Sequence, residues 1–96
     1  MMFGERIKEL RLNLGLNQVE FSKLLNVTKQ SVSNWENNNI LPSIDMLINI
    51  SKKFSVSADY LLGLSEIPTL NVQDLTTEQI THLQLLINDL KNTNNH

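Results

Sequence analysis

The segment from Leu16 to Asn39 constrains the fold most, because it predicts two short helices joined by a tight turn. Asn17 is followed three residues later by a glutamate, which is the spacing of a capping box, so a helix is predicted to begin directly after it. Asn26 lies where the turn needs a positive φ, a conformation that asparagine tolerates better than most residues other than glycine. Thr28 can cap the next helix, from about Lys29 to Glu36, whose outer face carries small polar and amide side chains.

The other apolar residues also have helical spacing, and no segment alternates as a strand would, which predicts an all-α fold. A first helix is expected from about Phe3 to Leu14, with Gly15 as its left-handed terminator. A fourth helix is expected to follow the N-cap Ser43, and a short fifth helix to cover residues 58–62. Ile44, Leu47, Ile48 and Ser51 are predicted to line one face of the fourth helix, which is expected to end near Phe54.

The chain is predicted to divide into three parts. Residues 1–66 are expected to form one compact domain of five helices around a single core. Residues 67–75 are predicted to be a linker, because Pro68 and mixed polar and apolar residues interrupt the helical period. Residues 76–92 are predicted to be an amphipathic helix that opens with a capping box at Thr76. The apolar seam of this helix has coiled-coil spacing and comprises Ile80, Leu83, Leu86, Ile87 and Leu90.

This last helix is too short to be stable alone in water, so its apolar seam must be covered. Two arrangements are open. The seam can dock on the chain's own domain, or it can pair with the same helix of a second subunit. We expect the homodimer, in which the helix serves for oligomerisation.

Composition excludes several classes of protein. The chain has no cysteine, and its two histidines, His82 and His96, are far apart, so neither a metal nor another cofactor is expected. No apolar run reaches the ~20 residues of a membrane span, and the charged segment MMFGERIKEL lacks the apolar core of a signal peptide. We therefore expect a soluble, cytoplasmic protein with no membrane partner. An enzyme is not expected, because no catalytic set of residues and no glycine-rich phosphate loop is recognisable.

The charge balance limits how the chain could bind nucleic acid. Residues 1–68 hold seven basic and seven acidic side chains, and the whole chain has a formal net charge of −2. A non-specific DNA binder is usually strongly basic. If the chain binds DNA, most contacts must therefore come from amides, hydroxyls, backbone N–H groups and helix N-termini.

From about Glu5 to Gly63 the chain resembles the lambda-repressor-like helix-turn-helix family, also called Xre-type or Cro-type regulators. The resemblance rests on the Asn-Gln start of the second helix, the VTKQSVSNWE stretch, the Pro-Ser start of the fourth helix and the V-S-x-D-x-L-L-G ending. It implies a five-helix domain that places its third helix in the major groove of double-stranded DNA.

The resemblance also implies roles for individual residues. Base contacts are expected from Lys29, Gln30, Ser33 and Asn34, since an amide can form two hydrogen bonds with adenine and a lysine can bond guanine. Phosphate contacts are expected from Asn17, Gln18, Thr28, Ser31, Asn37, Asn39 and Ser43. Arg11 and Glu36 are expected to form a structural ion pair. Trp35 is predicted to lie in the core, because proteins that stack bases on aromatic rings need several exposed ones.

The function that follows from these residues is sequence-specific regulation of transcription by a dimer that occupies a palindromic operator. A repressor of a prophage or mobile element is the leading interpretation, and a restriction–modification controller or an antitoxin are close alternatives. A different class is a protein-interaction module with weak or no DNA binding, whose partner would be a toxin or an antirepressor. The family often has Gly and then Lys or Arg at the positions of Asn38 and Asn39, and the absence of a basic side chain in this loop favours this last alternative.

Overall fold

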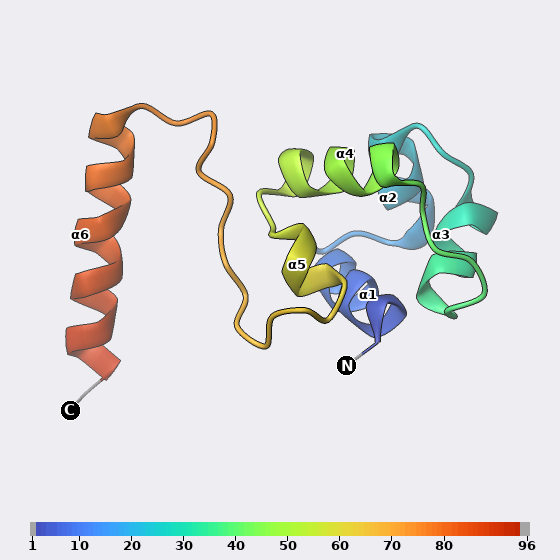
Figure 1. The fold of residues 1–96 in the computed structure, drawn as a ribbon, viewed down its shortest axis with the longest axis horizontal. Helices are drawn as coiled ribbons and strands as arrows, with labels where there is room; N and C mark the ends of the chain where they lie inside the picture. The colour runs from blue at the N-terminus through green and yellow to red at the C-terminus, as the bar shows by residue number, and fades with distance from the viewer. Residues whose placement is uncertain (1, 95–96) are drawn as a thin grey trace.

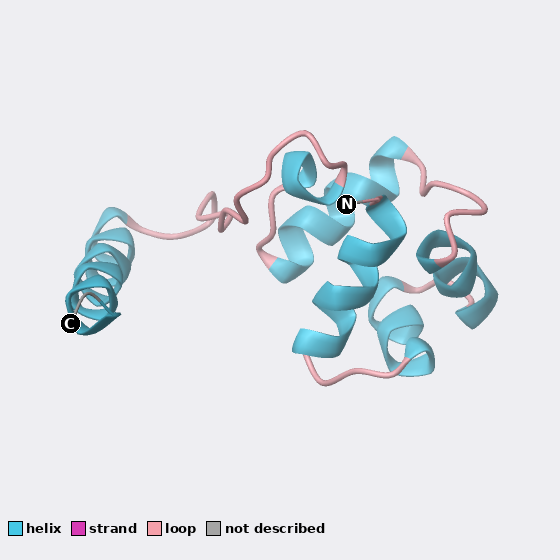
Figure 2. Cartoon of the chain, turned by 90° about the horizontal axis from the view of Figure 1, so that it is seen from below, coloured by secondary structure: helices cyan, strands magenta, loops and turns pink. Residues whose placement is uncertain are grey.

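Six helices make up the regular structure of residues 2–94, the part of the chain that the computed structural model describes (Figure 1). Their bounds are α1 (Phe3–Asn13), α2 (Gln18–Leu25), α3 (Lys29–Glu36), α4 (Ile44–Phe54), α5 (Ala58–Leu61) and α6 (Thr77–Asn94). The first five helices pack together and α6 stands apart from them, with loops as the only other structure in Figure 2. The all-α prediction of a five-helix domain followed by one further helix is confirmed.

The caps predicted from the sequence are present, and they set where the central helices begin. Asn17 accepts a hydrogen bond from the backbone N–H of Glu20, and the Glu20 carboxylate accepts one from the N–H of Asn17. Asn26 ends α2 with a φ of 57°, and the Thr28 hydroxyl accepts the N–H of Ser31 at 3.0 Å. Short-range side-chain chemistry therefore fixes the turn between α2 and α3.

The core of the domain lies between α1, α2, α3 and the part of the chain that runs from the second half of α4 to the end of α5. Phe21 of α2 stacks on Phe54 of α4 with ring centroids 5.1 Å apart, which joins these two helices. The fully or almost fully buried apolar residues are Phe3, Ile7, Phe21, Leu25, Val32, Trp35, Ile50, Val56 and Leu61. The prediction that Trp35 belongs to the core is confirmed.

Only part of the face predicted for α4 lies inward, since Leu47 packs against the core. Ile44 is 77% exposed and Ile48 is 46% exposed, whereas Ile50 is fully buried. Apolar residues cover more than one face of this helix, so their spacing alone does not fix its rotation. The stack of Phe54 on Phe21 fixes it instead, because Phe54 and Ile50 are four residues apart and share one side of the helix.

Part of the predicted linker lies against the domain. The N–H of Ser57 donates to the carbonyl of Thr69 at 3.2 Å, and the N–H of Asn71 donates to the carbonyl of Ser55 at 3.0 Å. These bonds flank an isolated antiparallel bridge between Val56 and Leu70. The chain therefore leaves the domain only after residue 71.

The last helix is mostly exposed, although Ile80 and Leu83 are half-buried and line a pocket together with Pro68, Leu70 and Val72 of the linker. The capping box at Thr76 is present, since Thr76 and Gln79 exchange hydrogen bonds of 2.9 and 3.1 Å. No residue of α6 is buried, and its exposed aliphatic side chains are Leu85, Leu86, Ile87 and Leu90. Within residues 2–94, no helix is both long and apolar enough to cross a membrane.

Candidate nucleic-acid interface

The outer face of α3 presents a row of polar side chains to solvent. Lys29 and Gln30 are exposed, and Ser33 and Asn34 are half-buried on the following turn. The inner face of the same helix is anchored by Val32 and Trp35 in the core. The structure thus brings the four residues predicted to contact bases together on one exposed surface.

Hydrogen bonds along this surface order its side chains. The Gln30 amide nitrogen donates to the Asn34 amide oxygen at 3.0 Å, one helical turn further on. The Asn37 amide nitrogen donates to the Ser33 hydroxyl at 3.3 Å, and the hydroxyls of Thr28 and Ser31 lie 3.0 Å apart. A ligand bound to this face would meet the polar groups that these hydrogen bonds leave free.

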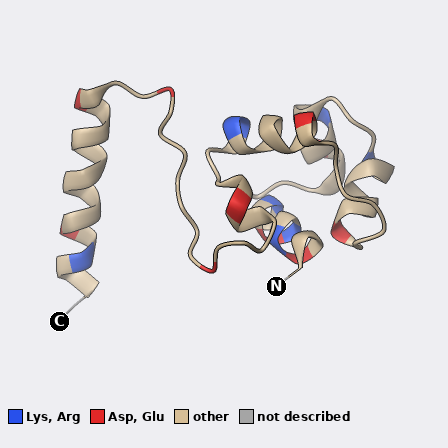
Figure 3. Cartoon of the chain, viewed as in Figure 1, with Lys and Arg blue, Asp and Glu red and all other residues tan. Residues whose placement is uncertain are grey.

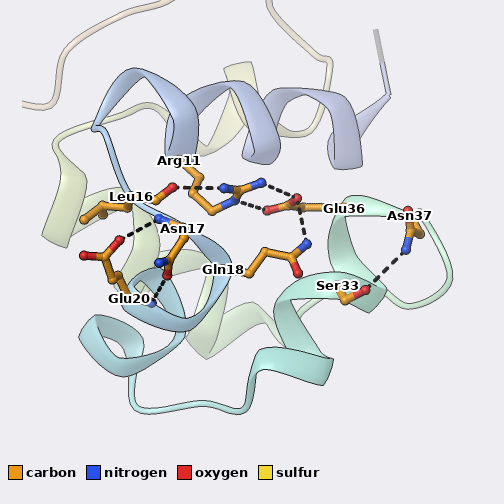
Figure 4. A network of polar contacts seen from close by, with 8 residues as sticks. All are labelled: Arg11, Leu16, Asn17, Gln18, Glu20, Ser33, Glu36 and Asn37. Atoms are coloured by element: carbon orange, nitrogen blue, oxygen red, sulfur yellow. Dashed lines mark hydrogen bonds and ion pairs between the residues drawn. The ribbon is translucent and has the colours of Figure 1, made fainter.

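The N-terminus of α2 lies beside α3 and carries two of the predicted phosphate ligands. Asn17 uses its side-chain oxygen in the cap, which leaves its NH₂ group available. Gln18 donates from its amide nitrogen to the Glu36 carboxylate at 3.2 Å (Figure 4). A second N–H remains on the same nitrogen, so Gln18 can brace α3 and still donate to an anion at this helix N-terminus.

Arg11 of α1 and Glu36 at the end of α3 form a bidentate ion pair beneath this surface (Figure 4). The Arg11 Nε lies 2.6 Å from Glu36 Oε2 and its Nη2 lies 3.0 Å from Oε1, and both side chains are buried. Arg11 also donates to the carbonyl of Leu16 at 2.9 Å. The hydrogen bond to Glu36 raises the pKa of the Arg11 guanidinium above its ordinary value, although burial acts in the opposite direction. The pair thus ties α1, the turn before α2 and the end of α3 together.

The loop after α3 divides its asparagines between two tasks. Asn37 and Asn39 are exposed beside α3, where a phosphate contact is sterically open. Asn38 instead has a φ of 59°, and its side-chain oxygen accepts the N–H of Gly4 at 2.8 Å. Asn38 therefore caps the first helix across the fold, a role that short-range sequence spacing did not reveal. Ser43 accepts the N–H of Met46 at 3.1 Å, so this predicted phosphate ligand also caps α4.

Arg6 is a second buried arginine that the sequence analysis did not single out. Its guanidinium donates to the backbone carbonyls of Tyr60 and Ser65 and lies 4.2 Å from the centroid of the Tyr60 ring. It also lies 3.5 Å from the Glu66 carboxylate. No sequence signal indicated that Arg6 is buried, because arginine side chains are usually exposed to solvent.

Charged residues are sparse and mixed in sign along the chain (Figure 3). Arg6 and Arg11 are committed to buried contacts, so residues 1–68 offer only the five lysines at positions 8, 23, 29, 52 and 53. Among the side chains predicted to contact DNA, Lys29 alone is charged. Within residues 2–94, no group of three or more His, Cys, Asp or Glu residues could hold a metal ion.

Comparison with known proteins identifies a matching family and several similar proteins. Residues 7–61 match the model of a helix-turn-helix family. The HTH-type transcriptional regulator ImmR of Bacillus subtilis is 38% identical over 80 residues, and the match covers 83% of this chain and 63% of ImmR. The chain thus spans slightly less than two thirds of that relative.

Two solved structures resemble the fold. The c2 repressor of Salmonella phage P22, in complex with a synthetic operator, is 34% identical with a TM-score of 0.61, over 65% of this chain and 94% of the crystallised repressor chain. The sequence match covers 28% of the full-length repressor. A chain of the complex of the SinR and SinI proteins is 28% identical with a TM-score of 0.62, and the match covers 90% of this chain and 79% of that one. The sequence match, the capped α2–α3 unit and these neighbours together show that this chain belongs to the helix-turn-helix family.

Proposed function

We propose that this protein is a sequence-specific, double-stranded DNA-binding regulator of transcription that acts as a dimeric repressor of a prophage or mobile element. The observation that carries the proposal is the exposed row of amide and hydroxyl side chains on α3, held outward by a buried core and a buried ion pair. The P22 c2 repressor, whose structure with an operator has the same fold, supports it. Such a regulator works in the cytoplasm, where the chromosome is.

In the proposed complex α3 enters the major groove and reads base edges through Lys29, Gln30, Ser33 and Asn34. The expected phosphate contacts come from side chains beside it, namely Asn17, Gln18, Thr28, Ser31, Asn37, Asn39 and Ser43. Their backbone N–H groups and amides suit a phosphate without adding charge. The regulator acts by occupying its operator, so no catalytic step is needed.

A dimer gives this weakly charged domain two half-sites to bind at once. In a two-fold dimer the recognition helices lie ~34 Å apart, one turn of DNA, which makes a palindromic operator the natural target. The proposed dimer interface is the apolar seam of α6, formed by Ile80, Leu83, Leu86, Ile87 and Leu90, of which the last three are exposed. Linking two weak sites raises the overall affinity without any new contact to DNA.

Selection of bound sites from random DNA, followed by a binding assay on the recovered sequence, tests this function. We expect an enriched palindrome and binding that falls at least tenfold in Gln30→Ala. The matched control is Gln73→Ala, which removes the same side chain from an exposed position in the linker. Because Lys29 is the only charged contact proposed, log K should fall with log salt with a slope of about −2 per dimer, a shallow dependence.

A second candidate function is that of a protein-interaction module, such as an antitoxin-type protein or one that meets an antirepressor. The zero charge of residues 1–68 and the largely exposed seam of α6 favour it. No enrichment of any sequence, and no binding to DNA at low salt, would select this alternative over the repressor.

A further inference from the structure

We infer that Asn34 sets the base specificity of this protein by fixing the amide of Gln30, so that Gln30 reads adenine while Asn34 reads a base that offers only acceptors. The inference rests on the proposed function and specifies its operator. It starts from the 3.0 Å hydrogen bond in which the Gln30 amide nitrogen donates to the Asn34 amide oxygen. Both side chains belong to the outer face of α3, and Gln30 is exposed.

The bond decides which groups Gln30 can offer to DNA. A glutamine amide has one acceptor oxygen and two N–H donors. One N–H is used by Asn34, so the oxygen and one N–H remain. The major-groove edge of adenine presents one donor, at N6, beside one acceptor, at N7. The two remaining groups of Gln30 match these two adenine atoms.

The same bond decides what Asn34 can offer. Its amide oxygen accepts from Gln30 with one of its two lone pairs, so Asn34 keeps both N–H donors but only part of its accepting capacity, and it meets DNA mainly as a donor. Two donors suit the acceptor groups of guanine, N7 and O6, or the O4 of thymine, better than the edges of adenine and cytosine, which carry the amino groups N6 and N4. Residues 30 and 34 are about 6 Å apart along the helix axis, so the two bases lie within about two base pairs of each other.

The hydrogen bond between Gln30 and Asn34 also orders the Gln30 side chain before DNA binds. A glutamine side chain on a solvated helix samples many rotamers, and ordering it on binding costs conformational entropy. An amide held by its neighbour one turn away has lost part of that freedom already, so less is lost on binding. Asn34 is therefore both a contact residue for its own base and a positioning residue for Gln30.

Three variants of the full chain separate these two roles, with site selection and competition between matched duplexes as the measurement. Gln30→Ala should abolish the adenine preference in its column of the operator. Asn34→Ala should reduce that same adenine preference about twofold, since an i, i+4 amide pair is weak. It should also reduce the guanine or thymine preference in the neighbouring column about tenfold.

Asn34→Asp is the decisive variant, because the carboxylate still accepts from Gln30 but donates nothing. We expect the adenine column to stay as in the parent while the neighbouring column changes to cytosine or adenine, whose amino groups are donors. Overall affinity falls with the added negative charge, so the ratios between duplexes are compared. Melting temperatures of all variants verify that the domain is folded.

Either of two results would overturn the inference while leaving the proposed function standing. One is an adenine preference that Gln30→Ala removes but Asn34→Ala leaves unchanged. The other is a guanine or thymine preference that persists in Asn34→Asp. If the parent protein enriches no sequence at all, the proposed function itself has failed, and the inference fails with it.

Discussion

Gly4 lies where α1 approaches the end of α3 too closely for a side chain. A Cβ atom at this position would sit 2.7 Å from the carbonyl oxygen of Trp35 and closer still to that of Glu36. These are backbone atoms, which cannot rotate away. In an exposed helix a change from glycine to alanine would gain about 1 kcal/mol. Here we expect Gly4→Ala to lower the free energy of unfolding by about 1–3 kcal/mol, measured by urea denaturation.

The control for this variant is Gly15→Asn. Gly15 has a φ of 73°, and nothing lies within 4 Å of a Cβ built on it. Asparagine tolerates that conformation, so the control should stay within about 0.5 kcal/mol of the parent. A Gly4→Ala variant as stable as the parent would contradict the close approach of α1 and α3.

Asn38 combines a backbone and a side-chain role, and two substitutions separate them. Asn38→Gly keeps the positive φ but removes the bond to the N–H of Gly4, so it should cost about 1 kcal/mol. Asn38→Ala loses the same bond and is also strained in the left-handed region, which should cost about 1 kcal/mol more. Thermal unfolding of both proteins measures the two terms. Equal stability of Asn38→Gly and the parent would mean that this cap contributes nothing.

The features of the helices that could be predicted from the sequence are those that depend on residues close together in the chain. The capping boxes at Asn17 and Thr76, the positive φ of Asn26 and the starts of α2, α3 and α4 all depend on side chains within three or four residues. The rotation of α4 depends on the stack of Phe54 on Phe21, across 33 positions of the chain. The burial of Arg6 against Tyr60 and Ser65 depends on chain segments more than 50 residues away. Such long-range contacts leave no periodic signal in a single sequence.

The ion pair between Arg11 and Glu36 is one of the contacts that hold α1 and α3 in place beneath the proposed interface. Arg11→Ala would leave the Glu36 carboxylate buried with only Gln18 as a partner. Removing one member of a buried pair costs about 3–5 kcal/mol, so we expect a clear drop in melting temperature. Arg11→Lys, which keeps the charge but loses the bidentate geometry, should lie between this variant and the parent.

DNA binding distinguishes this structural role from a direct one. If Arg11 is structural, DNA binding should fall only as the domain loses stability, and at low temperature much of it should remain. Unchanged melting together with lost DNA binding would instead identify Arg11 as a phosphate contact. The pKa of Arg11 lies above its already high ordinary value, so its guanidinium stays charged at neutral pH.

In the whole molecule, the five-helix domain buries its own apolar side chains, whereas α6 does not. The domain buries nine apolar side chains, whereas α6 buries none and stands clear of the other helices (Figure 1). The chain is held to the domain as far as residue 71 by two backbone hydrogen bonds, and α6 begins only six residues later. An isolated helix of this length is marginal in water, so a second copy of α6 is the partner we propose for its seam.

Ile87 and Leu85 offer a matched pair of substitutions that tests this assembly. Both are exposed aliphatic residues of α6, at 43% and 62%, and they point about 160° apart around the helix. Ile87→Asp places a charge in the proposed seam and should convert the dimer to a monomer in sedimentation experiments. Leu85→Asp places the same charge outside the seam and should leave the dimer intact.

If the recognition helices work as a linked pair, Ile87→Asp should also weaken binding to a two-half-site operator by at least tenfold. Its binding to a single half-site should not change, because no contact with DNA is lost. A monomeric parent protein, or equal effects of the two substitutions, would rule out pairing through this face of α6.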